Sequence, residues 1–136
     1  MPRTQVERKT FTYDFDVVGL GFRLKADARE ELAATIRRNA KVMSKGGAGI
    51  TGVKLRREQE NKYDINAIAV YYPDRGALAG KHLGYLRADT AAIIAPLMDD
   101  GKEGGLVFLR ASIIGILDGK RPNEVLKITA TFTDHR

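Results

Sequence analysis

The last part of the chain contains the pattern that most restricts its fold. Between residues 125 and 133, apolar and polar side chains alternate, which is the period of a strand with one buried face. The apolar face comprises Leu126, Ile128, Ala130 and Phe132, and the other face comprises Lys127, Thr129, Thr131 and Thr133. A second long apolar segment, 106–117, precedes it across the turn-prone loop 118–123. The two segments are therefore expected to form an antiparallel pair of strands.

Four more segments have the composition of strands, and two have that of helices. Strands are expected over 11–17, 53–56, 67–72 and 82–86. A helix over 27–44 is predicted from Asp27 as its N-cap, from the spacing of apolar residues and from the glycines that follow it. A second helix over 89–98 is limited or kinked by Pro96. This order predicts a mostly β fold, a small six-stranded antiparallel barrel of the OB or SH3-like kind with two α-helices.

Length and composition favour a single intracellular domain. The 136 residues suit a flexible N-terminal arm over 1–10 and one domain over 11–136. The chain has no cysteine, which excludes disulfides and a thiolate zinc site. It also has neither a signal-peptide core nor the run of about 18 apolar residues that crosses a membrane. We therefore expect a cytoplasmic protein with no membrane contact.

The charge of the chain is clearly basic, with a formal net charge of +6 and a pI of about 9.7. This basicity suits nucleic acid, anionic lipid or an acidic partner, and does not choose between them. Arg56 lies in the strand that leads into the turn 61–66, and Arg87 closes the strand that contains Tyr85. Cations beside an aromatic ring are typical of surfaces that bind single-stranded nucleic acid, although a solvated barrel exterior has the same pattern.

The sequence offers little material for catalysis. Its two histidines, His82 and His135, have no serine partner in a recognisable nucleophile setting, and a thiol mechanism is excluded. The acids at 58–60 and 99–100 lack the spacing of metal ligands and are expected at the solvated ends of elements. The glycines at 46–49 follow a helix and are not followed by Lys-Ser/Thr, so they do not form a phosphate loop. We expect no enzyme activity, no metal and no cofactor.

The segment 61–70 has an unusual junction between a turn and a strand. Asn61 and Asp64 favour a turn, and the apolar run that begins at Ala67 favours a strand. Two interpretations are open for Tyr63 and Asp64 between them. Either Tyr63 packs on the core while Asp64 caps an ordinary turn, or the two side chains are exposed. In the second case they offer a stacking face and a hydrogen-bond acceptor to a ligand.

Several segments, taken in order, resemble the HIRAN domain family. Its members occur alone in bacteria or fused to helicase-like ATPases that remodel replication forks. The resemblance covers roughly 13–133, and its most specific part is 61–70, which is similar to the family signature Asn-Pro-Tyr-Asp followed by Asn-Ala-Ile. Here Lys62 replaces the proline. The remaining matches are 17–22, 53–58, 83–86 and 91–99.

The resemblance implies an OB-like barrel that captures the 3′ end of single-stranded DNA. Asp64 would accept a hydrogen bond from the terminal hydroxyl, Tyr63 would supply a ring or hydroxyl contact, and Phe22 would stack on a base. Arg87 would contact a phosphate. Gly21 stands where DNA-binding members carry a basic residue. The full predicted set of nucleic-acid-binding residues is Phe22, Arg56, Asn61, Tyr63, Asp64, Tyr85 and Arg87.

The sequence thus predicts a non-catalytic nucleic-acid-binding module that acts in DNA repair or replication. Single-stranded DNA is its expected partner, with a helicase or nuclease as a possible protein partner. An alternative is a protein-interaction adaptor that uses the same groove or the amphipathic helix 27–44. A third alternative is an enzyme that acts on nucleic acid through unrecognised acids.

Overall fold

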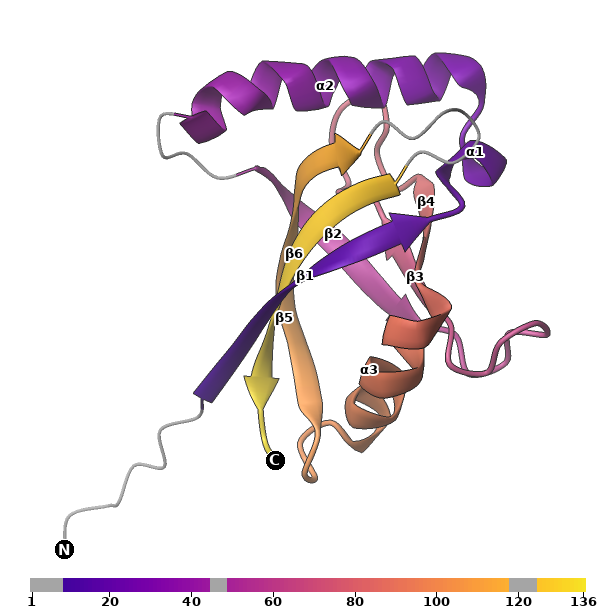
Figure 1. Ribbon diagram of the computed structural model, residues 1–136, viewed down its shortest axis with the longest axis vertical. Coiled ribbons are helices and arrows are strands. Elements are labelled where there is room, and N and C mark those ends of the chain that lie inside the picture. Colours follow the sequence, from indigo (N-terminus) through magenta and orange to yellow (C-terminus); the bar gives the residue numbers. More distant parts are fainter. Residues whose placement is uncertain (1–8, 45–48, 118–124) are drawn as a thin grey trace, which may run out of the picture.

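The computed structural model describes residues 9–44, 49–117 and 125–136, which form a barrel with helices at its ends (Figure 1). The strands are β1 (Lys9–Val18), β2 (Ile50–Arg57), β3 (Ile68–Tyr71), β4 (His82–Leu86), β5 (Leu106–Leu117) and β6 (Val125–Asp134). The helices are α1 (Leu20–Arg23), α2 (Ala26–Ser44) and α3 (Ala88–Asp100).

The strands close into an antiparallel barrel in the order β1-β4-β3-β2-β5-β6, with β6 paired back to β1. This confirms the predicted six-stranded antiparallel barrel. The β5–β6 ladder runs from Leu106 opposite Asp134 to Leu117 opposite Val125, as expected from the two long apolar segments. The loop 118–123, predicted to connect them, lies outside the described residues.

The core of the barrel is built on the apolar face predicted for the last strand. Leu126, Ile128, Ala130 and Phe132 are each 0% exposed. Their opposite face is mixed, because Thr131 is also buried and forms a hydrogen bond with Thr12 of β1 (Oγ1–Oγ1 3.0 Å). β6 therefore contributes a full row of side chains to the core and pairs with a neighbour on each side.

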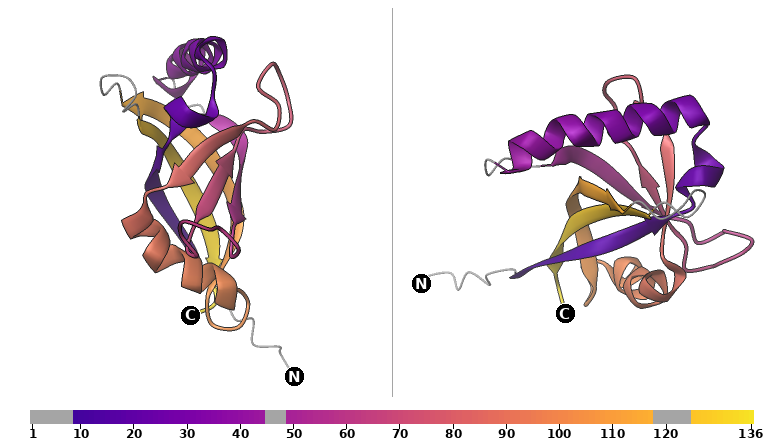
Figure 2. Two further views of the ribbon diagram at one scale, coloured as in Figure 1. Left: turned by 90° about the vertical axis from the view of Figure 1, so that its right-hand side faces the viewer. Right: turned by 45° about the horizontal axis from the view of Figure 1, so that its top comes forward.

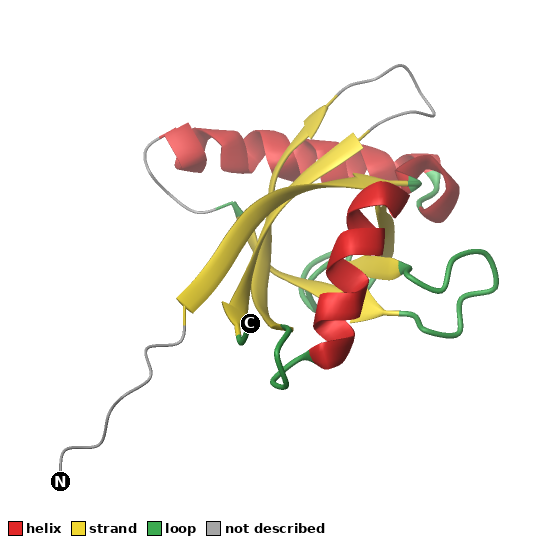
Figure 3. Ribbon diagram, turned by 60° about the horizontal axis from the view of Figure 1, so that its bottom comes forward, coloured by secondary structure: helices red, strands yellow, loops and turns green. Residues whose placement is uncertain are grey.

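The two long helices lie at opposite ends of the barrel, as the views in Figures 2 and 3 show. The first begins at Ala26, so Asp27 lies in its first turn and is not its N-cap. The carboxylate of Asp27 accepts a hydrogen bond from the N–H of Ala28 (2.9 Å). The second continues through Pro96 to Asp100 and packs on β5 and β4. None of the helices in the described ranges is long and apolar enough to cross a membrane.

Two further features differ from the sequence-based expectation. The single-turn helix α1 was not predicted, and it follows Gly19, whose φ of +86° favours glycine. β1 begins at Lys9, so the last two residues of the arm predicted over 1–10 belong to a strand. Residues 1–8 and the glycines 46–47 are not among those described.

A close approach of two strands fixes the point where β4 meets β1. Gly84 has a φ of +150°, and a Cβ atom at this position would lie 2.2 Å from the carbonyl oxygen of Val18. Val18 lies opposite Tyr85 in the ladder, next to this contact. Only glycine allows the two backbones to approach so closely, and the pairing in turn places Tyr85 at the end of the barrel near α1.

We expect Gly84→Ala to lower the free energy of unfolding by about 2–4 kcal/mol, because the new methyl group strains the backbone and separates β1 from β4. Urea denaturation measures the change. Gly115→Ala is the matched control, since a Cβ there has no neighbour within 4 Å, and a change within about 0.5 kcal/mol is expected. Equal effects of the two substitutions would contradict the proposed importance of this contact.

Candidate nucleic-acid interface

The outer face of strands β2, β3 and β4 combines cations with aromatic rings. Residues directly opposite each other in a ladder point to the same face of a sheet. The register therefore forms two rows that cross the three strands. One row contains Arg56, Ala69 and Tyr85, and the other contains Lys54, Tyr71 and His82.

The rings on this face contact one another and one side chain of α1. Tyr71 stacks on His82 with ring centroids 4.8 Å apart, and the edge of His82 meets Tyr85 at 4.9 Å. The guanidinium carbon of Arg23 lies 5.2 Å from the centroid of the Tyr85 ring, which attaches α1 to β4. Burial lowers the pKa of His82, whose Nε2–H donates a hydrogen bond to the carbonyl of Gly84 (2.9 Å).

Glu58 connects these rings to the segment between β2 and β3. Its carboxylate Oε1 accepts hydrogen bonds from the Tyr85 hydroxyl (3.0 Å) and from Nδ2 of Asn61 (3.0 Å). Burial acts to raise the pKa of Glu58, but the hydrogen bonds from Asn61 and Tyr85 outweigh it, and the pKa lies below its ordinary value. Glu58 therefore lies at the end of β2, as expected, but it is half-buried and bonded to two side chains.

Asn61 holds the turn that contains the signature residues. Its Oδ1 accepts hydrogen bonds from the backbone N–H groups of Tyr63 (2.9 Å) and Asp64 (3.0 Å). At the base of the loop the N–H of Glu58 donates to the carbonyl of Ala67 (3.0 Å). The loop 58–67 therefore has a defined conformation in which the side chain of Asn61 orders the turn.

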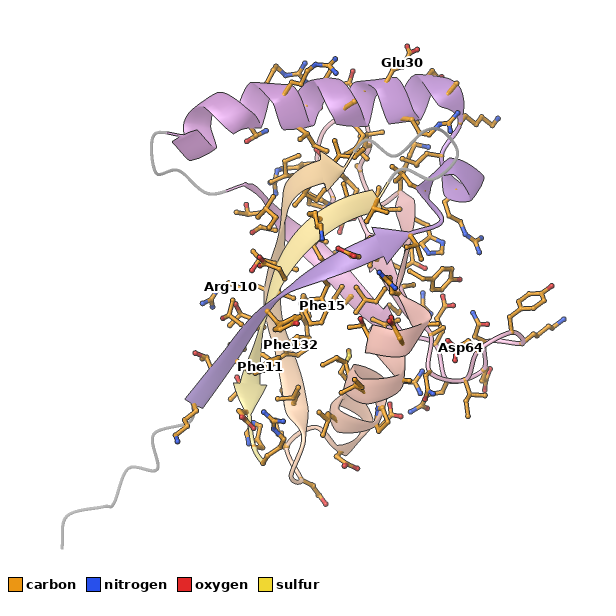
Figure 4. All side chains as sticks on the ribbon, viewed as in Figure 1. Phe11, Phe15, Glu30, Asp64, Arg110 and Phe132 are labelled. Atoms are coloured by element: carbon orange, nitrogen blue, oxygen red, sulfur yellow. The ribbon has the colours of Figure 1, made fainter. Side chains whose placement is uncertain are left out.

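Tyr63 and Asp64 combine the two interpretations left open by the sequence. Tyr63 is 97% exposed, so it does not pack on the core. Asp64 does cap the turn, because its Oδ1 accepts a hydrogen bond from the N–H of Asn66 (2.8 Å). Its other oxygen, Oδ2, has no hydrogen-bond partner among the described residues. Figure 4 shows Asp64 on the loop, away from the barrel axis.

The loop is also attached to the end of α3. Nη2 of Arg57 and Nε2 of Gln59 donate to the two carboxylate oxygens of Asp99 at 3.1 and 3.0 Å. Nη1 of Arg57 donates to the carbonyl of Ala67 (3.2 Å). Asp99 lies at the exposed end of α3, as expected, and it also anchors the loop.

The other predicted site residues lie at different distances from this loop. Arg56 is exposed on the outer face and helps to line a polar hollow of about 460 Å³ with Asn61. Arg87 lies at the start of α3, where its guanidinium pairs with Asp16 (3.7 Å) and Asp89 (3.4 Å). Phe22 belongs to α1, but its side chain is outside the described part of the structure.

Sequence reasoning missed Glu58, His82, Tyr71 and Arg23 as parts of this surface. The cross-strand register places Tyr71 opposite His82 and Arg56 in one row with Tyr85, while the loop 58–67 and α1 add Glu58 and Arg23. No spacing along the chain encodes that register directly.

We expect Tyr85→Phe to raise the pKa of Glu58 toward its ordinary value of 4.5 and to lower the free energy of unfolding at pH 7 by about 1 kcal/mol. A lowered carboxylate pKa stabilises the folded chain above 4.5, and this contribution is lost as the pH falls through the folded value. The difference in the free energy of unfolding between the variant and the parent protein should therefore become smaller at acidic pH.

NMR titration of the Glu58 carboxyl carbon and urea denaturation test this expectation. Tyr71→Phe is the control, since its hydroxyl has no hydrogen-bond partner in the described ranges. An unchanged Glu58 pKa in Tyr85→Phe would show that the hydroxyl does not support the carboxylate.

Comparison with known proteins agrees with this architecture. The family model of the HIRAN domain matches residues 11–113. The crystal structure of the HIRAN domain of human HLTF has a TM-score of 0.55 and 20% identity, over 90% of this chain and 75% of that one. A crystal structure of a protein from Lactobacillus plantarum has a TM-score of 0.53 and 22% identity, over 91% and 99% of the two chains. No curated protein matches the chain.

At these identities the two crystal structures establish a shared fold. The family model covers well over half of the chain, and it includes β1 to β4, the loop 58–67 and α3. HIRAN domains are binding modules, which supports nucleic-acid binding as the function of this fold. The chain is a member of the HIRAN domain family.

Proposed function

We propose that this chain binds the 3′ end of single-stranded DNA through the loop 58–67 and the adjoining outer face of β2–β4, without catalysing a reaction. The proposal rests mainly on the surroundings of the two carboxylate oxygens of Asp64. One of its oxygens is held by the N–H of Asn66, and the other has no partner among the described residues. Such a module serves DNA repair or replication in the cytoplasm, beside a helicase or nuclease that performs the chemistry.

An ionised carboxylate held in this way selects for a hydroxyl group. It only accepts hydrogen bonds, so a terminal 3′-hydroxyl can donate to the open oxygen of Asp64. A 3′-phosphate carries negative charge and acceptor oxygens, which the same carboxylate repels. The turn around Asn61 fixes the backbone on which Asp64 stands, so the acceptor is in place before DNA binds.

Aromatic side chains supply contacts to the terminal bases. The ring of Tyr63 is almost fully exposed, and a base stacked on such a ring contributes about 1–3 kcal/mol. Phe22, on α1 beside β4, is our proposed second stacking residue. Tyr85 has a different role, because Arg23 covers its ring and Glu58 accepts its hydroxyl. We assign Tyr85 and Asn61 to positioning the loop.

Arg56 is the better of the two predicted phosphate contacts. It is exposed on the outer face and forms no ion pair within the described residues. Arg87 already has two carboxylate partners, Asp16 and Asp89. Its charge is therefore partly neutralised before a phosphate approaches.

We expect the parent protein to bind a fluorescent single strand with a 3′-hydroxyl about tenfold or more tightly than the same strand with a 3′-phosphate. The hydroxyl forms a hydrogen bond to the charged carboxylate of Asp64, and the phosphate does not. Asp64→Asn keeps an oxygen that caps the turn but removes the charge, so it should abolish the preference while the fold persists. Fluorescence anisotropy measures both affinities. Equal affinity of the parent protein for the two ends would contradict the role of Asp64.

We expect Arg56→Ala to weaken binding to all single strands and to reduce the slope of log K against log salt by about 0.7, the value for one phosphate contact on a single strand. Arg87→Ala is the matched control and should change the slope less. A larger change of the salt slope in Arg87→Ala than in Arg56→Ala would show that Arg87 is the main phosphate contact. Absence of any salt-dependent DNA binding would refute the proposal and favour the adaptor alternative.

A further inference from the structure

One edge of β1 is open along most of its length. β1 pairs with β6 from Lys9 to Val17, but with β4 only at Val17 and Val18. No strand within the described residues covers the other edge between 9 and 15. Figure 1 shows β1 extending past β4 toward the N-terminus. The barrel is therefore closed at one end and has a free strand edge at the other.

The backbone groups on this open edge can be identified. The N–H of Arg87 donates to the carbonyl of Asp16 (3.2 Å), so the backbone groups of Asp16 point away from β6. These groups alternate in direction along a strand. Those of Thr10, Thr12 and Asp14 therefore point to the same open edge. They have no backbone partner among the described residues.

An apolar groove runs beside this edge. It has a volume of about 280 Å³ and lies between β1 and α3. Tyr13 and Ile93, from its two walls, are 56% and 68% exposed. Phe11 and Phe15 extend the β1 wall and are labelled in Figure 4, while Ile94 extends the α3 wall.

The rim of the groove is acidic, although the chain as a whole carries a net charge of +6. Asp14 is exposed and forms no ion pair within the described ranges. The side chain of Asp89 is 70% exposed and pairs with Arg87 (3.4 Å). Asp16, by contrast, is neutralised by Lys127 and Arg87. Asp14, which has no ion-pair partner among the described residues, favours a cationic ligand over nucleic acid or anionic lipid.

We propose that the β1 edge is a docking site for an extended, basic segment of a partner protein, which adds to the barrel as a further strand. Its backbone would bond to the outward groups of Thr12 and Asp14, as in other β-strand additions. Its apolar side chains would enter the groove between Tyr13 and Ile93, and alternate Lys or Arg residues would meet Asp14. A second copy of this chain fits less well, because its own edge carries the same acids. The proposal does not depend on DNA binding by the loop 58–67.

The test uses the whole protein and an acetylated, amidated peptide of alternating valine and arginine, with a valine–glutamate peptide as the control. We expect the arginine peptide alone to bind, and to shift the NMR amide signals of Thr12 and Asp14. Thr12→Pro removes the outward N–H without touching the ladder to β6, and Thr12→Val removes only the hydroxyl bonded to Thr131. Binding should fall roughly tenfold or more in Thr12→Pro relative to Thr12→Val, as expected for the loss of about one backbone hydrogen bond and its pairing.

Asp14→Lys is the second variant, and it tests the proposal if Thr12→Pro does not fold. It should weaken the arginine peptide and strengthen the glutamate peptide. Asp64→Asn should leave peptide affinity unchanged, which separates this site from the DNA-binding proposal. Equal binding by Thr12→Pro and Thr12→Val, equal binding of both peptides, or dimerisation of the free protein through β1 in sedimentation velocity would overturn the proposal.

Discussion

The rest of the structure depends on the pairing of β6 with both β5 and β1. One face of β6 is wholly buried, and each of its larger apolar side chains stabilises the fold by roughly 1.5–3 kcal/mol. The ladder to β1 closes the barrel, so it also determines where β4 must join. Because β4 ends at Leu86, opposite Val17, it meets β1 at two pairs and leaves the remaining edge open. The site at the loop and the groove at β1 both follow from this unequal closure.

The candidate DNA site shows how one side chain orders a turn. No proline ring restricts the backbone here, because Lys62 follows Asn61. Asn61 orders the turn, since it accepts hydrogen bonds from two backbone N–H groups and donates one to Glu58. Arg57 joins the same loop to Asp99 at the end of α3. The loop therefore combines a fixed backbone with an exposed ring at Tyr63, which suits a ligand that stacks and is then recognised at its end.

The sequence predicts those parts of the fold that have a local signal. The segments 82–86 and 106–117 were predicted with the bounds that the structure shows, because apolar runs and turns delimit them. The helix α1 has no such signal, since a single turn is too short to show a periodic pattern. The contacts of Glu58 and Asp99 could not be predicted, because their partners lie 27 and 42 residues away in the chain. Contacts of this kind depend on how strands and helices pack in space, which the alternation of apolar and polar residues does not specify.

The charge distribution separates the two proposed surfaces. Among the described residues, Arg56 on the outer face of β2–β4 and Asp14 beside the β1 groove have no ion-pair partner, whereas Lys54 pairs with Asp74 and Asp89 pairs with Arg87. A polyanion is therefore attracted to the first surface and repelled from the second, and a basic segment has the opposite preference. β4 connects the two, because Tyr85 points to the loop and the next residue but one, Arg87, begins α3 beside the groove. Since the close contact at Gly84 fixes β4 against β1, a protein segment bound at the β1 edge would be held in a set orientation to DNA bound at the loop.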